Sequence, residues 1–356
     1  MSTATAPASA AVSDGLAALR AEFTDAAGYL AACTVGLTTR ATRAALHADL
    51  ERRPDPVAYG AAVEFSRAHY ARLVGVDVDR VAIGSHTSVL ASMIAASLPD
   101  GAEVLCPTDE FSSLVLPFVY AGRGIRVRSV PLAELADAIG STTALVAFSL
   151  VQSATGEVAD ADAIGDAAHR HGVRTLCDVT QAAGWMPVDA ARFDATVCHT
   201  YKWLSAPRGV AFLTVTEDAA AWLTPVHAGW YAGADPWASC YGDGARLATC
   251  ARRFDVSPAW QAFLGAEPAL RAFADADSDA LYASTTALAT DFRERLALPM
   301  PARPSAIVSW ADPGGRDLQR LESAGIVASG RNGRARVAFH VFNTADDVTA
   351  AVDALT

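Results

Sequence analysis

The stretch that decides the fold is TVCHTYKWLSAPRGVAFLTV, residues 196–215. It contains two apolar runs, Thr196–His199 and Val210–Val215, which are separated by a turn at Ala206–Gly209. Lys202 lies between these runs, where a solvated charge is unusual. Burial lowers the pKa of an amine, and a neutral amine is a nucleophile towards carbonyl groups. The stretch therefore predicts two buried strands with a reactive lysine between them.

A carboxylate precedes this lysine at the end of another apolar strand, Arg174–Asp178. Alone, an aspartate at a strand end usually forms a turn, and a lysine there usually reaches solvent. Together, Asp178 and Lys202 are the two groups that a pyridoxal phosphate (PLP) site requires. The lysine forms a Schiff base with the cofactor, and the acid keeps the pyridine nitrogen protonated. The spacing leaves room for a turn, a short helix and one strand between them.

Composition limits the class of protein. The chain has 356 residues, 52% of them hydrophobic, and a formal net charge of −11 with only 28 basic residues. This balance argues against nucleic-acid binding, which needs clustered basic side chains. We see no secretory signal and no apolar stretch long enough to span a membrane. Six cysteines without a CxxC pair predict free thiols and no metal site. We expect a cytoplasmic enzyme.

Apolar strands alternate with helices through the first two thirds of the chain, which predicts an α/β fold with a mostly parallel sheet. The predicted strands are 81–84, 103–107, 126–130, 144–150, 174–178, 195–199 and 210–215. Ligands of such sheets bind at the carboxyl ends of the strands. Ser85, Asp178 and the Tyr201–Lys202 pair all fall at or near predicted strand ends.

The last third of the chain is predicted to be built differently. Residues 222–257 have no clear period and indicate a long irregular segment of functional importance. One long helix is expected from Pro258 to about Arg295, then a small sheet from 306–310, 325–329 and 335–341, and a helix from Asp346. We therefore expect a large domain at 51–257 and a small domain made from 1–50 and 258–356.

The segment around Lys202 and Asp178 resembles the class V aminotransferase family of fold-type I PLP enzymes, and the resemblance extends from about Gly28 to Val352. This family includes cysteine desulfurases, kynureninases, isopenicillin-N epimerase-like proteins and the sulfoxide lyases of ergothioneine biosynthesis. The Tyr201–Lys202 pair is more similar to kynureninases, because desulfurases usually have His-Lys. The resemblance implies a large domain with a mostly parallel seven-stranded sheet flanked by helices, and a small α+β domain.

The resemblance also implies which residues bind PLP. Lys202 matches the Schiff-base lysine, Asp178 the partner of the pyridine nitrogen, and Gln181 the contact to the ring oxygen. Phe111 matches the residue that stacks on the ring, and Ser153 stands where desulfurases have an asparagine. The phosphate would be bound by His199, Tyr201 and the start of a helix at His86, Thr87 and Ser88, where backbone N–H groups favour an anion. Without the family, those polar residues are ordinary helix caps.

Three further residues are assigned to the substrate or to a partner subunit. Arg336, followed by a strand and Asn343–Thr344, matches the arginine that binds the substrate carboxylate. Ser257 matches a residue that contacts the phosphate of the neighbouring subunit, and Trp230 matches a residue that lines the substrate pocket. Trp230 could equally be a packing residue. These assignments imply a homodimer with shared active sites.

The chain departs from cysteine desulfurases at residues 327–333, where no cysteine precedes Arg336. Transfer of sulfur to the enzyme needs a positioned thiolate, so a desulfurase is not expected. Cys33, near the N-terminal turn, is the nearest substitute.

The resemblance implies a reaction at Cα of an amino acid through an external aldimine, with Lys202 as acid and base. We expect a lyase, acting at a carbon–sulfur bond. An aminotransferase or an epimerase of secondary metabolism is the alternative, and a PLP-binding homologue without activity is a third. The sequence does not name the substrate.

Overall fold

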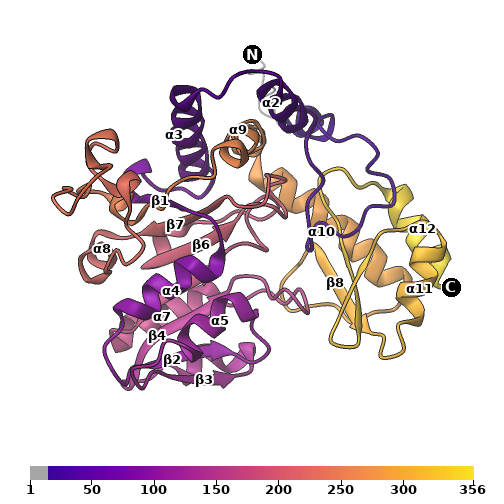
Figure 1. The fold of residues 1–356 in the computed structure, drawn as a ribbon. Helices are drawn as coiled ribbons and strands as arrows, with labels where there is room; N and C mark the ends of the chain where they lie inside the picture. Colours follow the sequence, from indigo (N-terminus) through magenta and orange to yellow (C-terminus); the bar gives the residue numbers. More distant parts are fainter. Residues whose placement is uncertain (1–14) are drawn as a thin grey trace, which may run out of the picture.

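The protein is described here from a computed structural model, which covers residues 15–356. Two sheets organise it, a seven-stranded sheet in the order β1-β7-β6-β5-β4-β2-β3 and a three-stranded sheet in the order β8-β10-β9. Figure 1 shows the larger sheet with its helices in one lobe and the smaller sheet with the C-terminal helices in another. The predicted α/β fold with a seven-stranded sheet is confirmed.

Most neighbours in the large sheet run parallel. Strands β2 to β6 form parallel pairs, and only β7 runs antiparallel to its neighbours β1 and β6. The strands are β1 (Val81–Gly84), β2 (Glu103–Pro107), β3 (Arg126–Val130), β4 (Thr143–Ser149), β5 (Arg174–Asp178), β6 (Ala195–His199) and β7 (Ala211–Val215). The parallel strands therefore end at one edge of the sheet, which is where sequence placed the site.

Helices cover both faces of this sheet. One face carries α4 (Thr87–Ser97), α5 (Ser112–Val119) and α8 (Glu217–Trp222). The other carries α3 (Pro56–Leu73), α6 (Leu135–Ala138), α7 (Ala161–His171) and α9 (Trp260–Asp275). Local sequence sets several of these boundaries. Asp160 caps the N-terminus of α7 by accepting a hydrogen bond from Ala163 N, and Gly172 ends the helix with φ of 64°.

The second lobe combines sequence from both ends of the chain. It holds β8 (Ile307–Ala311), β9 (Ser329–Arg331), β10 (Arg334–Ala338), α10 (Ser278–Arg295), α11 (Arg316–Ser323) and α12 (Ala345–Leu355). The N-terminal segment, indigo in Figure 1, runs beside these elements, with bridges from Tyr29 to Val327 and from Ala31 to Ala338. Helix α2 (Arg40–Leu50) then leads back and packs on α9.

The division of the chain into domains after residues 50 and 257 stays a proposal. Leu30 belongs to the same hydrophobic cluster as Phe292 and Val337, which supports joining the N-terminal segment to the small domain. Helix α9, however, contributes Phe263 and Leu270 to the core of the larger sheet. This packing argues for a second boundary after α9.

Two predicted elements are wrong in detail. The long helix from Pro258 is two helices, α9 and α10, because Ala276 is extended (ψ 151°) and Asp277 caps a new helix through Ala280 N. The strand predicted at 325–329 is instead β9, which begins at Ser329. The segment 222–257 is irregular as predicted, with only short 3-10 turns after α8.

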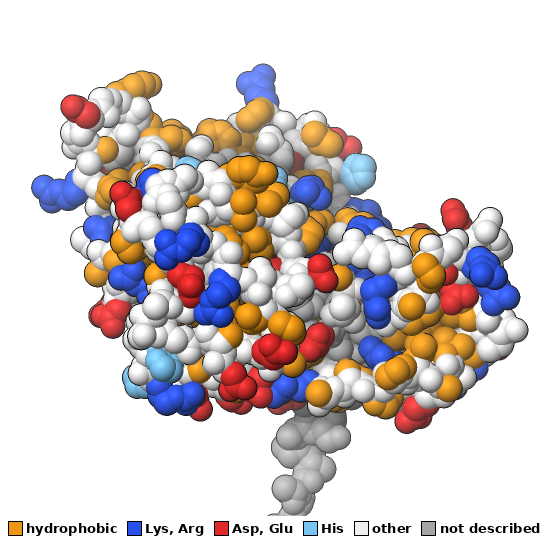
Figure 2. All heavy atoms as spheres, turned by 90° about the horizontal axis from the view of Figure 1, so that it is seen from below, with side chains coloured by type: hydrophobic (Ala, Val, Ile, Leu, Met, Phe, Trp, Pro, Cys, Tyr) orange, Lys and Arg blue, Asp and Glu red, His pale blue; other side chains and the backbone are white. Residues whose placement is uncertain are grey.

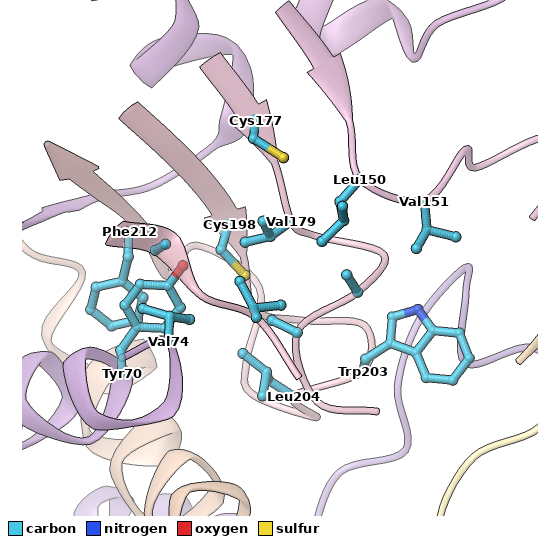
Figure 3. Packing of buried hydrophobic residues seen from close by; sticks show 14 of the residues in the cluster. Tyr70, Val74, Leu150, Val151, Cys177, Val179, Cys198, Trp203, Leu204 and Phe212 are labelled. Carbon is cyan, nitrogen blue, oxygen red and sulfur yellow. The ribbon is translucent and has the colours of Figure 1, made fainter. Parts of the chain in front are cut away.

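The core next to the site is tightly packed (Figure 3). The rings of Tyr70 and Phe212 stack at 4.3 Å and 10°, and Trp203 beside Lys202 is fully buried. On the face in Figure 2, basic, acidic and hydrophobic side chains are interspersed. No helix in residues 15–356 has the length and apolar character needed to cross a bilayer.

Candidate active site

One pocket collects most of the predicted residues at the carboxyl ends of the parallel strands. Asp178 is the last residue of β5, His199 is the last residue of β6, and α4 begins just after β1. The predicted residues that line this pocket are His86, Thr87, Ser88, Phe111, Ser153, Asp178, Gln181, His199, Tyr201 and Lys202. Residues far apart in sequence therefore meet where the fold predicts a ligand.

Lys202 is only 5% exposed, although it follows a strand end. Burial lowers the pKa of its amine to about 8, while the charges of Asp178 and Cys33 act in the opposite direction. Its Nζ lies 5.1 Å from the centroid of the Phe111 ring. An amine with this pKa is partly neutral near neutral pH, as a nucleophile must be.

Asp178 is the buried acid of the pocket, with 3% of its surface exposed. Burial raises its pKa to about 6, against the effects of hydrogen bonds from Thr180 and of the Lys202 charge. Oδ1 accepts a hydrogen bond of 2.8 Å from Thr180 N. Among the described residues no donor reaches Oδ2, which is left to accept a proton-bearing ring nitrogen.

The start of helix α4 forms a polar end to the pocket. The side chain of its N-cap, His86, makes no capping hydrogen bond, so the first N–H groups of α4 are open to a ligand. Thr87 and Ser88 line the same end with their hydroxyl groups. A helix N-terminus of this kind favours a bound phosphate.

His199 adds a neutral donor near this end. Burial lowers its pKa to about 3. Gly209 N donates to Nε2 over 3.5 Å, which leaves the ring hydrogen on Nδ1. Its ring packs edge-on against Tyr201, at 4.4 Å, and Tyr201 in turn lies under the guanidinium of Arg208, at 4.7 Å.

Gln181 is held by four groups of its own chain. Its Nε2 donates to Cys33 O at 2.9 Å and to Ser153 Oγ at 3.0 Å, while Oε1 accepts from Trp203 Nε1 at 2.8 Å. Trp185 Nε1 donates to the backbone carbonyl of Gln181 at 2.6 Å. Both amide hydrogens are therefore used, and the predicted contact with the cofactor ring oxygen requires one of them to change partner.

Arg336 lies next to this network and is 1% exposed. Its Nε donates to Ser329 Oγ at 3.1 Å, Nη2 to Thr34 Oγ1 at 2.9 Å and Nη1 to Ser153 Oγ at 3.2 Å. Nη1 also donates to the Ser153 carbonyl. Arg336 forms no ion pair with a carboxylate of the described residues, and it contacts the pocket residue Ser153 without itself lining the pocket.

Trp230 and Ser257 lie apart from the pocket. They contact each other instead, through a hydrogen bond of 3.2 Å from Trp230 Nε1 to Ser257 Oγ. Ser257 is exposed. Their predicted roles in a neighbouring subunit therefore stay predictions.

Sequence reasoning missed three residues of this region. Arg208 lines the pocket, Thr34 holds Arg336, and Glu110 accepts hydrogen bonds from Ser149 at the end of β4. Arg208 could have been found, because it belongs to the turn that follows Lys202. Thr34 and Glu110 carry no local signal, since their partners come from elsewhere in the chain.

Comparisons with known proteins agree on one family. The model of the class-V aminotransferase family matches residues 58–301. The chain is 31% identical over 218 residues to an isopenicillin N epimerase from Amycolatopsis lactamdurans, covering 54% of this chain and 53% of the relative. It is 32% identical over 239 residues to a kynureninase from Deinococcus radiodurans, covering 63% and 57%.

The solved structure of the cystine C–S lyase C-DES with its product cysteine persulfide has the same fold. It matches with a TM-score of 0.82 and 21% identity, over 93% of this chain and 97% of that one. The matches to the isopenicillin N epimerases span only about half of those relatives, 46% and 53% of their lengths.

Proposed function

This chain belongs to the class-V aminotransferase family of PLP-dependent enzymes, and from that premise we propose that it is an amino-acid lyase that eliminates a sulfur-linked group. The observation that carries the proposal is the buried Lys202 amine, whose pKa is lowered to about 8 beside the acid Asp178. A strongly perturbed pair of this kind in a pocket is typical of a catalytic site.

The residues fit PLP at each end of the pocket. The open N-terminus of α4, with Thr87 and Ser88, suits the phosphate, and the free oxygen of Asp178 suits the pyridine nitrogen. Lys202 suits the aldehyde, and the Phe111 ring suits the face of the heterocycle. When bound, PLP supplies an aldehyde that condenses with amines and a ring that withdraws electrons from the bonds at Cα.

The protein's own groups would then bind the substrate and move its proton. Arg336, buried and without a carboxylate partner in residues 15–356, would hold the substrate carboxylate through its guanidinium. Lys202 Nζ would take the Cα proton, which its lowered pKa permits near neutral pH. The hydroxyl groups of Thr34 and Ser329 keep the guanidinium in place.

The hairpin of β9 and β10 supports a lyase over a desulfurase. Residues 327–333 form β9 and its turn and contain no cysteine. Cys33 is 1% exposed and lies 3.9 Å from Ser329 Oγ, behind the pocket rather than on its wall. A sulfur-containing group would therefore leave as a product, because no exposed thiolate is placed to accept sulfur from it.

Epimerisation is the second candidate, favoured by the similarity to isopenicillin N epimerases. It would use the same Lys202 and Arg336 but return the proton to Cα. Transamination stays a third possibility within the family, and it would need a second 2-oxo acid.

One experiment separates these reactions. The holoenzyme is reduced with borohydride and digested, and mass spectrometry locates the cofactor, which we expect on Lys202. A panel of amino acids and S-conjugates is then incubated with wild type and with Lys202→Ala. Release of ammonia and a 2-oxo acid from one substrate supports the lyase, whereas loss of chirality alone supports the epimerase. A label on another lysine would refute the assignment of the site.

We also propose a cytoplasmic homodimer. All six cysteines are free thiols, which suits a reducing compartment. Ser257 and Trp230, which match residues that reach a neighbouring subunit in the family, lie on the irregular segment 222–257, and Trp237 on the same segment is exposed. Light scattering should give twice the chain mass of 37.0 kDa, and a monomer that retains full activity would contradict shared active sites.

A further inference from the structure

We propose that Glu110 is the positioning residue of this pocket: its carboxylate joins the carboxyl ends of β2 and β4 and so holds the Phe111 ring over Lys202. Glu110 follows β2 by three residues and is half-buried. The inference rests on the proposed role of Lys202 as the amine that bears the cofactor.

Four hydrogen bonds converge on this carboxylate. Oε1 accepts from Phe111 N and from Ser149 Oγ, each at 2.6 Å, and Oε2 accepts from Ser149 N at 2.8 Å and from Gln152 Nε2 at 2.7 Å. Among the described residues no basic side chain lies within 4.0 Å of it. Its two oxygens are therefore held by donors from the end of β4, from Gln152 and from the start of α5.

The backbone just before Glu110 is unusual. Asp109 has φ of 59°, in the left-handed region that non-glycine residues rarely adopt. This conformation costs about 1–3 kcal/mol and persists only where the surrounding contacts demand it. It turns the chain so that the carboxylate of Glu110 faces β4.

Two parts of the pocket depend on this arrangement. Phe111 is the N-cap of α5 and is 39% exposed, and its ring lies 5.1 Å from Lys202 Nζ. Ser149 pairs in register with Asp178 on the next strand. Glu110 thus connects the residue above the lysine with the strand that bears the acid, and its negative charge also contributes to the raised pKa of Asp178.

Glu103 offers a matched control at the other end of the same two strands. Its Oε1 accepts from Arg128 Nη2 and from Thr143 Oγ1, both at 3.1 Å, so it also joins β2 to β4. It lies far along the strands from the pocket and lines no part of it. Glu103→Gln should therefore affect stability without affecting the cofactor.

The test measures PLP affinity and visible circular dichroism of reconstituted wild type, Glu110→Gln and Glu103→Gln. Loss of an ordered aromatic contact should weaken PLP binding by roughly fivefold to tenfold in Glu110→Gln and diminish the dichroism. Glu103→Gln should match wild type in both. In the apoprotein, Glu110→Gln should also speed deuterium exchange in peptides that contain the Phe111 and Ser149 amides.

A double-mutant cycle with Phe111→Leu tests whether Glu110 affects PLP affinity through the Phe111 ring. If Glu110 acts through Phe111, Glu110→Gln changes PLP affinity by less than twofold once the ring is gone. Fully additive effects would overturn the proposal, and so would wild-type affinity in Glu110→Gln. Should that variant fail to fold, Ser149→Ala removes one donor and should show a smaller effect in the same direction; no effect there would refute the proposal. Wild type that binds no PLP at Lys202 would instead refute the proposed function.

Discussion

At the residue scale, the burial of Lys202 lowers the pH at which its amine becomes neutral. Its pKa is lowered to about 8, mainly by burial, and the Asp178 charge partly counters this effect. The neutral amine therefore accumulates as the pH rises through about 8. The rate of PLP uptake by the apoenzyme should rise with a midpoint near pH 8, as measured by stopped-flow absorbance between pH 6 and 10.

The same experiment on Asp178→Asn checks the cause. Removing that negative charge removes a contribution that raises the pKa of Lys202, so the midpoint should move to lower pH. A midpoint near 10 in both proteins would show that the amine is solvated.

The buried lysine should also reduce the stability of the apoprotein. Its pKa falls from 10.5 in the unfolded chain to about 8 in the fold, so the penalty is fully present below pH 8 and disappears as the pH rises to 10.5. Lys202→Met apoprotein should be more stable than wild type at pH 7, by on the order of 3 kcal/mol at most. Urea denaturation at pH 7 and pH 10.5 measures the difference, which should shrink at the higher pH.

Residues with a local signal could be found from sequence, and residues defined by tertiary contacts could not. Lys202 and Asp178 each stand beside an apolar run, which identifies a charge at a strand end. Glu110 also follows a strand, but its importance comes from Ser149 and Gln152, about forty positions later. The sequence pattern alone does not predict that these residues are in contact.

At the scale of elements, a buried ion pair fastens helix α3 to the segment beside β1. Arg67 Nη2 lies 2.7 Å from Asp255 Oδ2, and Asp255 Oδ1 accepts from Ile83 N at 2.8 Å. Both side chains are almost inaccessible, at 1% and 0%. Because β1 leads into the start of α4, this pair supports the polar end of the pocket.

Breaking that pair should be costly. Asp255→Ala leaves the buried Arg67 charge with the half-exposed Glu64, 3.1 Å away, as its remaining carboxylate partner among the described residues, and we expect a loss of up to about 3–5 kcal/mol in the free energy of unfolding. Arg40→Ala, which removes an exposed pair with Glu22, should cost less than about 1 kcal/mol. Guanidinium denaturation of both variants tests the contrast, and equal losses would contradict it.

The elements that sequence placed correctly are those with a strong period and clear ends. The strands from β1 to β7 lie within a residue or so of their predicted positions, because each is a short apolar run between breakers. The helix predicted from Pro258 was too long because its apolar period continues through Ala276 and Asp277. The only local signal of the break between the two helices is the N-cap formed by Asp277. A single aspartate is weak evidence in a sequence that a helix ends and another begins.

At the scale of the whole molecule, the N-terminal segment crosses directly against the Lys202 loop. Gly36 N donates to Tyr201 O at 2.9 Å, and a Cβ at position 36 would lie 2.0 Å from Lys202 O. Two distant parts of the chain therefore need a glycine to approach this closely. No pattern in the sequence predicts this contact, although the alternation of strands and helices predicts the sheet next to it.

Gly36→Ala should displace the loop and weaken PLP binding by at least tenfold, as measured by titration of the apoprotein. Gly60→Ala is the matched control, because a Cβ at that position in α3 meets nothing within 4 Å. The control should bind PLP normally and gain up to about 1 kcal/mol from its helical position. Normal PLP binding by Gly36→Ala would show that the Lys202 loop can shift to accommodate the added methyl group without loss of affinity.

The contact between Arg336 and Thr34, residues 302 positions apart, has a consequence for how the enzyme is made. The guanidinium reaches Thr34 only after nearly the whole chain has left the ribosome. At a synthesis rate of about 5–20 residues per second, the nascent N-terminal segment waits for tens of seconds without its partner. This contact therefore forms only late in synthesis, and a chain that ends before residue 336 lacks it.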